Sequence, residues 1–263
     1  MPPIHDEVPL PPSALARLAG ADAVFTSGLT VNEMALLAEC GLAPVGLVIG
    51  TAMQHIGMHP QRWAQSVELG MLTEATRGGR ELALTRMQAE ADALEADGVV
   101  GARIQVVGHE GAGDVVEFLA TGTAVCPTGD ARYRTAAGRP FTSELSGQDL
   151  WTLLKTGHAP VAVVVGVCVY HVAHQAMRQA MAPHVELPPY SQALYDAREL
   201  AMTRLQAAAA AQGAGGVVGV RIEDSSRVWG PHALEVTAIG TAVRSHPVEA
   251  PLALPARTLP VVP

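Results

Sequence analysis

The sequence predicts an α+β protein in which one folding unit is present twice. Phe25–Ser27 reads FTS, and the same three residues return 116 positions later at Phe141–Ser143. Each copy continues with a helical apolar period and then two β-rich segments joined by a short polar or Gly-bearing turn. The length of 263 residues also suits two domains of about 120 to 130 residues each.

The two copies match over about one hundred residues, which indicates a duplicated unit. His55 and His171 are 116 positions apart, whereas later matches such as Arg80 with Arg198 are 118 positions apart. The second copy has therefore gained two residues between His171 and Arg198. This stretch contains several prolines, and we interpret it as a loop, because loops tolerate insertions best.

The chain divides into five segments. A stretch with glycine, proline and charge but no apolar period separates the copies, and we interpret it as a linker. Both ends are Pro-rich, and we expect extended, poorly ordered tails. The C-terminal tail is a candidate for peptide-type docking, with an inert tail as the alternative. The segments are an N-terminal arm (1–24), the first repeat (25–127), the linker (128–140), the second repeat (141–246) and a C-terminal tail (247–263).

Each repeat is predicted to open with a short helix and a buried strand. Thr30 with Glu33, and Ser146 with Asp149, fit a hydroxyl N-cap followed three residues later by an acid. This pattern gives both acids a structural role. The next segments are uncharged and rich in β-branched residues, as expected of strands buried on both faces. These segments are 45–56 and 161–172.

A longer helix and a hairpin complete each repeat. The helix carries one apolar stripe that faces the sheet. The stripe consists of Leu84, Met87, Ala91 and Leu94 in the first repeat, and of Met202, Leu205 and Ala209 in the second. Two antiparallel strands then close the repeat. The paired segments are 99–107 with 115–125, and 217–223 with 234–243.

Ion pairs are predicted across both hairpins. A turn centred near Glu110 places Arg103 opposite Glu117. The same register in the second repeat places Arg221 opposite Glu235. A bulge of one residue would change this register.

Composition excludes several classes of protein. Apolar residues make up 49% of the chain and charged residues 16%, which excludes a largely disordered protein. The formal charge of −8, without a cluster of Lys or Arg, argues against nucleic acid or an anionic membrane as the partner. The longest uncharged apolar run, 159–169, is too short for a membrane-spanning helix, which needs about 20 residues.

We expect a non-enzymatic protein of the cytoplasm. The three cysteines form no CxxC pair and none recurs in the other copy, so neither a disulfide framework nor a repeated zinc–thiolate site is predicted. The acidic N-terminus lacks the features of an export signal. The sequence shows no nucleophile with a base, no paired acids and no phosphate-binding glycine loop.

Histidines are the candidate metal ligands. His55 and His171 occupy the same point of the repeat, at the end of a strand, and each has a second histidine nearby, His59 and His174. A divalent ion is the expected ligand, or a soft ion near the methionines that flank the first pair. The alternative is that these histidines make hydrogen bonds at a strand end or an interface.

Charged residues also recur on the main helix. Arg80 and Glu81 of the first repeat correspond to Arg198 and Glu199 of the second. We expect a solvated face or intersubunit salt bridges. Exposed pairs of this kind contribute about 0 to 1 kcal/mol each. An anion-binding role is the alternative.

The segment 80–104, RELALTRMQAEADALEADGVVGARI, followed by FLATGTAV at 118–125, resembles the YbjQ family, which is described as heavy-metal-binding. The resemblance covers roughly 43–125 and 159–243. It implies a helix over a curved antiparallel sheet and assembly into pentameric rings. The second repeat departs from the Ala-Asp pattern of the family, since Ala214 and Gly215 precede Gly216.

Together these observations predict a non-enzymatic homo-oligomer, most simply a ring of five chains, that binds a metal or a small ligand. Fusion of two units that bury their sheets against each other raises their effective concentration. One alternative is a structural scaffold or shell component without a ligand. Another is a hydrolase with an unrecognised site.

Overall fold

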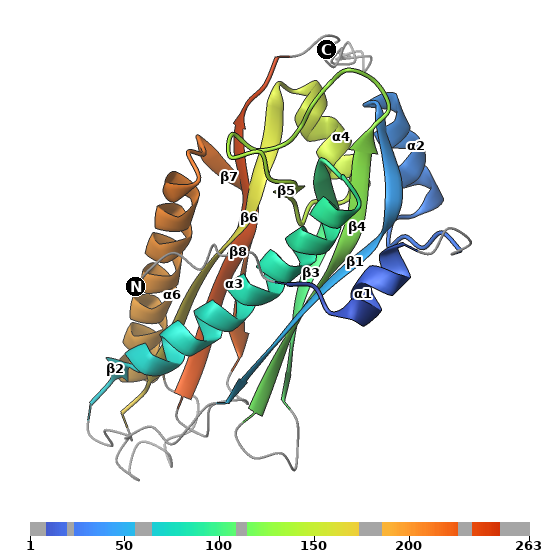
Figure 1. The fold of residues 1–263 in the computed structure, drawn as a ribbon. Coiled ribbons are helices and arrows are strands. Elements are labelled where there is room, and N and C mark those ends of the chain that lie inside the picture. Colours follow the sequence, from blue (N-terminus) through green and yellow to red (C-terminus); the bar gives the residue numbers. More distant parts are fainter. Residues whose placement is uncertain are drawn as a thin grey trace, which may run out of the picture.

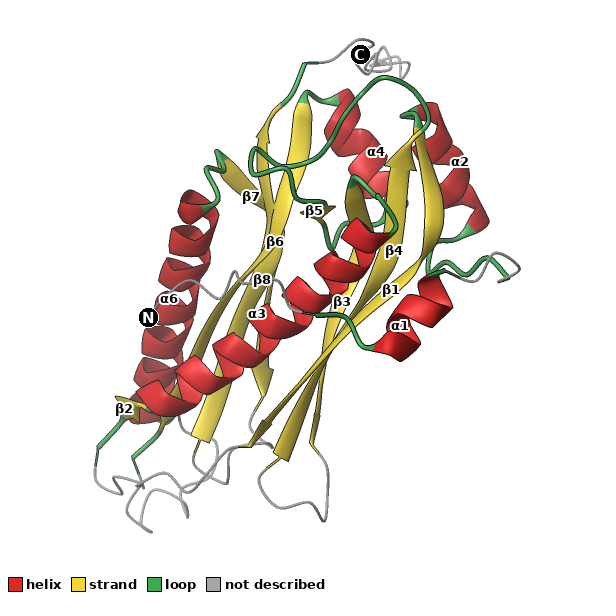
Figure 2. Ribbon diagram, in the orientation of Figure 1, coloured by secondary structure: helices red, strands yellow, loops and turns green. Residues whose placement is uncertain are grey.

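The computed structural model describes residues 9–19, 24–55, 65–108, 115–173, 186–225 and 233–247. Two four-stranded sheets stand side by side in this part of the chain, and each is covered by a long helix (Figure 1, Figure 2). Both repeats have the same order of main elements, namely a short helix, a strand, a long helix and a hairpin. The predicted α+β fold, with an extra short helix in each repeat, is confirmed.

The first repeat supplies three strands to one sheet. Its strands run antiparallel, with β4 between β1 and β3. The helix α3 packs across β1 and β4. The elements are α2 (Val31–Glu39), β1 (Leu42–His55), β2 (Val67–Glu68), α3 (Gly70–Ala93), β3 (Gly98–Gly108) and β4 (Val115–Pro127).

The second repeat builds the other sheet in the same way. Here β8 lies between β6 and β7, and α6 packs across β6 and β8. The elements are β5 (Phe141–Thr142), α4 (Gly147–Lys155), β6 (His158–His171), α6 (Pro188–Ala211), β7 (Gly216–Ser225) and β8 (Ala233–Ser245).

The two sheets exchange short strands. The strand β2 belongs to the first repeat but pairs antiparallel with β6 of the second. The strand β5 opens the second repeat but pairs parallel with β3 of the first. The repeats are therefore joined by main-chain hydrogen bonds as well as by the linker.

Local sequence signals account for the short helices and for the helix–strand spacing. The N-caps Thr30 and Ser146 accept hydrogen bonds from the main-chain N–H groups three residues later, as predicted. In β1, a Cβ at Gly50 would lie 2.0 Å from the Ala83 carbonyl oxygen of α3. Only glycine allows the strand and the helix to approach so closely.

The buried face of α3 is turned slightly from the predicted stripe. Met87 and Ala91 are buried as expected, but Ala83 is fully buried and Leu84 only half-buried. Small side chains face β1 because the strand lies so close to the helix at Gly50.

The predicted register of the hairpins is wrong. Arg103 lies opposite Thr121, and Arg221 lies opposite Ile239. Glu117 faces Val107 across its hairpin. The pairing is centred two residues after Glu110, and each residue of displacement moves the cross-strand partner by two positions.

The N-terminal arm is not extended throughout. Pro12–Leu18 form the helix α1, in which Pro12 occupies a first-turn position that suits its fixed φ angle. Arg17 of α1 donates a hydrogen bond to the Leu47 carbonyl oxygen (2.8 Å) and pairs with Glu90. The proposed docking segment in the C-terminal tail lies outside the described residues.

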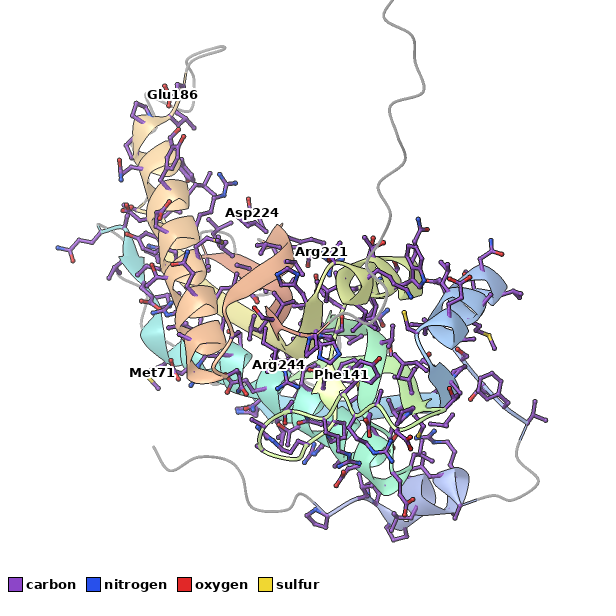
Figure 3. All side chains as sticks on the ribbon, turned by 90° about the horizontal axis from the view of Figure 1, so that it is seen from above. Met71, Phe141, Glu186, Arg221, Asp224 and Arg244 are labelled. Atoms are coloured by element: carbon purple, nitrogen blue, oxygen red, sulfur yellow. The ribbon has the colours of Figure 1, made fainter. Side chains whose placement is uncertain are left out.

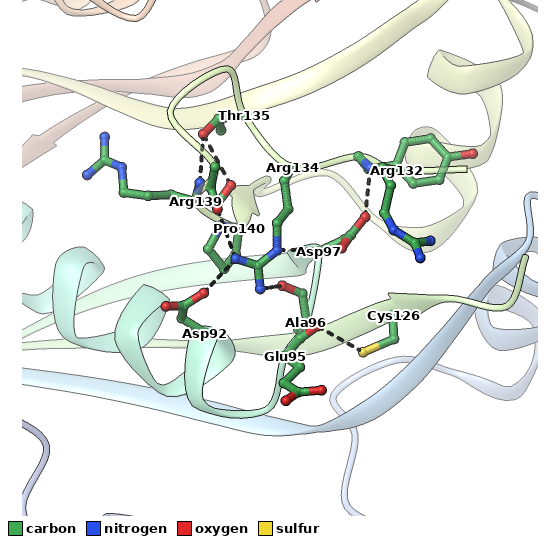
Figure 4. A network of polar contacts seen from close by, with 12 residues as sticks. Asp92, Glu95, Ala96, Asp97, Cys126, Arg132, Arg134, Thr135, Arg139 and Pro140 are labelled. Carbon is green, nitrogen blue, oxygen red and sulfur yellow. Dashed lines mark hydrogen bonds and ion pairs between the residues drawn. The ribbon is translucent and has the colours of Figure 1, made fainter. Parts of the chain in front are cut away.

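The linker packs against the end of α3. Arg134 bonds to the carboxylate of Asp92 (2.7 Å), and the main-chain N–H of Tyr133 donates to Asp97 (2.7 Å) (Figure 4). Residues 128–140 contain neither helix nor strand. None of the helices in the described part of the chain combines the length and apolar character needed to cross a bilayer.

Candidate functional site at the junction of the two repeats

The contact surface between the repeats, here called the junction, begins with β5 on β3. Gly98 pairs with Phe141, and Val99 pairs with Thr142. The main-chain N–H of Ser143 donates to the Val99 carbonyl oxygen (2.9 Å). The Phe141 side chain is 1% exposed and fills the space above Gly98, where a Cβ would lie 2.1 Å from the ring. Phe141 therefore anchors the junction.

The second part of the junction is β2 on the edge of β6. Val67 pairs with His171. The main-chain N–H of Leu69 donates to the Val169 carbonyl oxygen (2.8 Å), and the Val169 N–H donates to the hydroxyl of Thr73 (2.9 Å). The edge of β6 is thus hydrogen-bonded to the first repeat.

The third part of the junction is apolar. The helix α3 covers the face of β6 that points away from α6, and four valines of that face are buried in a core shared with the first repeat. These residues are Val163, Val165, Val167 and Val169. Burial of both faces explains why this strand carries an uninterrupted apolar sequence.

A buried ion pair crosses the junction. Arg80 of α3 pairs with Glu235 of β8, and their side chains are 7% and 3% exposed. The Arg80 guanidinium also donates to the Thr76 carbonyl oxygen (3.2 Å) and lies 5.2 Å from the centre of the Phe118 ring. The expectation of a solvated face is wrong for Arg80, because the second repeat covers it.

The equivalent arginine of the second repeat lies in a different setting. Arg198 bonds to Asp224 at 2.5 Å, and its side chain is 41% exposed. Glu81 pairs with Arg77 on the same helix (2.6 Å), and Glu199 is exposed. The helix position that is buried at the junction is therefore uncovered at the other end of the chain.

A second ion pair joins α6 to β2. Arg204 donates to the Val167 carbonyl oxygen (2.8 Å) and pairs with Glu68 of the first repeat (2.9 Å). Its counterpart Arg86 donates to the Thr51 carbonyl oxygen, which is the equivalent atom of β1. Arg204 thus binds the edge of β6 in its own repeat and also forms an ion pair with the first repeat.

Arg103 and Arg221 meet at Glu144 rather than across their hairpins. Arg221 lies 3.3 Å from the Glu144 carboxylate, and Arg103 donates to the Glu144 main-chain carbonyl oxygen. Burial raises the pKa of Glu144, and the two arginines offset only part of this effect. The first repeat has Gly28 at this position, so this cluster occurs once in the chain.

The candidate metal ligands lie in different sheets. His55 is exposed at the end of β1, whereas His171 is 1% exposed at the end of β6. His59 and His174 lie outside the described residues. Within the described ranges, no group of three His, Cys, Asp or Glu side chains is arranged to hold a metal ion.

The cysteines are poor thiolates. Burial raises the pKa of Cys168 to about 12 and also raises the pKa of Cys40 and Cys126. A protonated thiol is a weak nucleophile and a weak metal ligand.

A cavity of about 360 Å³ opens beside the junction. Its lining includes Glu81 and Gln88 of α3, Arg139 of the linker, Val163 of β6 and Gln212, which follows α6. Charged and apolar groups of both repeats thus face one space.

Sequence reasoning missed the strand exchange, although a signal was present. Val67-Glu68-Leu69 recurs 118 positions later as Val185-Glu186-Leu187. In the first copy this triplet provides β2 and the ion pair to Arg204. The same triplet locates the two-residue insertion between His171 and Glu186, because the offset between the copies is 116 at His171 and already 118 at Glu186.

The fold and the duplicated motif define the class of this protein. The family model described as "Putative heavy-metal-binding", YbjQ, matches residues 63–128 and 159–246. These two stretches cover more than half of the chain, one in each repeat. The chain belongs to the YbjQ family.

Two relatives are similar to it in sequence. One, from Mycobacterium tuberculosis, is named "Encapsulin nanocompartment protein Rv1762c" and is 47% identical over 239 residues, which cover 89% of this chain and 91% of that protein. The other, a UPF0145 protein of Shewanella frigidimarina, is 42% identical over 62 residues, which cover 24% of this chain and 56% of that protein. The first relative therefore matches nearly end to end.

Proposed function

We propose that this protein is a self-assembling structural component of a ring or shell and has no enzymatic activity. One observation carries the proposal. The surfaces that the repeats bury against each other at the junction are present a second time at the two ends of the chain, where they are more exposed. The relative named as an encapsulin nanocompartment protein, similar along 89% of the chain, supports a shell component.

Equivalent side chains of the two repeats differ strongly in their exposed fraction. Phe141 is 1% exposed, whereas Phe25 is 48% exposed. Val169 of β6 is fully buried, whereas its counterpart Met53 of β1 is 59% exposed. Exposed apolar side chains on the face of a sheet favour contact with another protein surface.

We further propose a closed ring of five chains in the cytoplasm. The surface at one end of the chain differs from that at the other end, so the contact is head-to-tail. Head-to-tail contacts close into a ring when the rotation per subunit divides a full turn, and otherwise form filaments. The resemblance to a family of pentameric rings favours five.

Light scattering coupled to size-exclusion chromatography, together with negative-stain electron microscopy, tests the proposal. We expect a single species at a multiple of 27.3 kDa, five times that mass for the ring, and particles of uniform diameter. A homogeneous monomer at micromolar concentration would contradict self-assembly. A stable particle with another number of chains would contradict only the ring of five.

Metal or small-ligand binding is a second candidate function. The family's description and the cavity beside the junction favour it. Protein purified without a His tag would be analysed for bound metals and for thermal stabilisation by added divalent ions and Cu(I). If His55 and His171 are ligands, replacing both with Ala abolishes the stabilisation. Unchanged stabilisation would contradict that assignment.

A further inference from the structure

We infer that neighbouring chains join by repeating the junction, with the second repeat of one chain seated against the first repeat of the next. This inference rests on the proposed self-assembly and specifies its contacts. Two strand additions define the contact. Phe25–Ser27 of the neighbouring chain adds to β7, as Phe141–Ser143 adds to β3. Glu186 and Leu187 add to the edge of the neighbouring chain's β1, as Glu68 and Leu69 add to β6.

The receiving strand β7 has the features that β3 uses at the junction. Gly216 corresponds to Gly98, and a Cβ there would meet no atom closer than 3.9 Å, so the place of a phenyl ring is open. Gly219 has a φ angle of +65°, the same as Gly101, so the two strands carry the same irregularity. Both glycines of the motif are thus present on a strand edge that the described residues leave exposed.

The donor segment of the first repeat is exposed in the single chain. Phe25 is exposed, and the preceding Val24 is 87% exposed. At the junction, Gln88 of α3 donates to the Pro140 carbonyl oxygen, directly before Phe141. Gln206 holds the same position on α6 and is exposed, so it can donate to the Val24 carbonyl oxygen of the neighbouring chain.

The edge of β1 and the N-terminal end of α6 carry the groups that could bond to each other between neighbouring chains. At the junction, the Val169 N–H donates to Thr73 and its carbonyl oxygen accepts from Leu69. The counterpart of Thr73 is Ser191, which retains the hydroxyl. In the single chain Ser191 donates to Glu186 (2.9 Å), and its oxygen can still accept from the Met53 N–H of the neighbouring chain.

Figure 3 shows that the tip of α6 lies apart from the junction. Phe141 lies in the middle of the molecule, whereas Glu186 lies at the outer tip of α6. An acid at this tip is positioned to meet a basic group of another chain.

Charge complementarity holds at both ion pairs of the junction. The pair Arg80–Glu235 corresponds to Arg198 and the neighbouring chain's Glu117. The pair Glu68–Arg204 corresponds to Glu186 and the neighbouring chain's Arg86. All four signs are retained.

The bonds that the two arginines make in the single chain are compatible with these contacts. Arg198 is 41% exposed and forms an exposed ion pair with Asp224. Such pairs contribute little, so the Arg198 side chain can turn toward a new carboxylate at a small cost in free energy. Arg86 already donates to the Thr51 carbonyl oxygen, as Arg204 does to that of Val167. The guanidinium group is thus oriented along the β1 edge before a neighbour arrives.

One side chain of the junction has no counterpart between chains. Glu144, which faces both Arg103 and Arg221, corresponds to Gly28. The contact between chains therefore lacks this carboxylate. We expect it to open at lower denaturant concentration than the junction within the chain.

A charge-exchange experiment tests the inference. Arg198→Glu and Glu117→Arg each place like charges at the contact, and each should raise the concentration needed for assembly about tenfold or more. The double variant Arg198→Glu/Glu117→Arg restores opposite charges and should restore assembly. Arg132→Glu is the matched control, at an exposed arginine that donates to the Gly129 and Ala131 carbonyl oxygens of the linker.

Mixing the two single variants separates loss of the contact from loss of folding. Each purified variant should remain a folded monomer, and an equimolar mixture should assemble, because every contact then joins a glutamate to an arginine. Such contacts alternate along the chain of subunits, so the mixture should give open chains or even-numbered rings rather than rings of five.

The outcomes distinguish the inference from the proposed function. If the unaltered protein is a monomer, self-assembly itself is refuted. If the unaltered protein assembles and both single variants assemble equally well, the inferred contact is wrong and self-assembly stands. Phe25→Asp gives an independent arm: assembly retained in this variant would also overturn the inferred strand addition to β7.

Discussion

Removing one partner of the buried ion pair gives the most quantitative prediction for stability. In Glu235→Gln, the guanidinium of Arg80 would stay buried in the junction without a carboxylate opposite it. The side chain of Arg80 is 7% exposed, so water cannot replace the lost partner without opening the contact between α3 and β8. Thr237, whose hydroxyl lies 3.2 Å from the Glu235 carboxylate, would also lose its charged acceptor.

The expected loss follows from this burial. Breaking a buried ion pair by removing one member costs about 3 to 5 kcal/mol, because an uncompensated charge remains inside the protein. An exposed pair contributes about 0 to 1 kcal/mol. The pair Arg198–Asp224, with side chains 41% and 34% exposed, is the internal comparison. Asp224→Asn should therefore cost several-fold less than Glu235→Gln.

Urea unfolding followed by circular dichroism measures both losses, at a protein concentration at which the variants have the same assembly state. Replacing Arg80 with Met in the Glu235→Gln background removes the unpaired charge and should recover part of the lost stability. A loss of less than about 1 kcal/mol in Glu235→Gln, equal to that in Asp224→Asn, would refute a buried pair that joins the repeats.

Three further predictions follow from packing and ionisation. Gly78→Ala in α3 should raise the free energy of unfolding by about 0.5 to 1 kcal/mol, because the added Cβ meets nothing within 4 Å. Gly79→Ala should lower the free energy of unfolding by about 1 to 3 kcal/mol, because the added Cβ would lie 2.4 Å from the Phe118 ring. Thermal unfolding of the two variants checks both signs. Cys168, with a pKa of about 12, should resist alkylation at pH 8 in the folded protein and react once urea is added, as measured by mass spectrometry; equal rates would contradict its burial. Partial burial favours the protonated form of Glu33, but hydrogen bonds from Thr30 and Gly147 outweigh this effect and lower the pKa of Glu33. The stability that ionised Glu33 contributes is therefore present above the ordinary carboxyl pKa and is lost as the pH falls through the lowered pKa. The difference in free energy of unfolding between wild type and Glu33→Gln should shrink between pH 7 and pH 3.

The elements within each repeat could be predicted because their signals are local. The caps at Thr30 and Ser146 lie within four residues of the groups they bind. The uncharged strand β6 and the hairpins follow from residue patterns of a few positions. The duplication repeats each of these local patterns, which strengthens the prediction of the fold class.

The junction could not be predicted, because its contacts join residues far apart in the chain. Comparison of the repeats singled out both Arg80 and Glu235, but the predicted partner of Glu235 was Arg221, and only the structure pairs it with Arg80. The register error arose from a turn centre misplaced by two residues. The short strand β2 carries too few residues for a periodic signal, and only its repetition as Val185–Leu187 distinguishes it.

The surface at the ends of the chain could have been recognised from the repeat alone. A duplicated unit that binds its own copy head-to-tail always leaves one donor and one receiver surface unmatched. In this chain Phe25 belongs to the donor surface and Gly216 to the receiver surface. Both match the residues that meet at the junction, Phe141 and Gly98, although Phe25 and Gly216 do not meet within the chain.

A cryo-electron microscopy reconstruction of the assembled particle would show directly how the chains meet. We predict that every contact between chains has the Phe25 ring of one chain over Gly216 of the next, and that all repeats, within and between chains, are related by nearly the same rotation. A map in which chains meet through two copies of the same surface, or in which β7 stays uncovered in a closed particle, would contradict it.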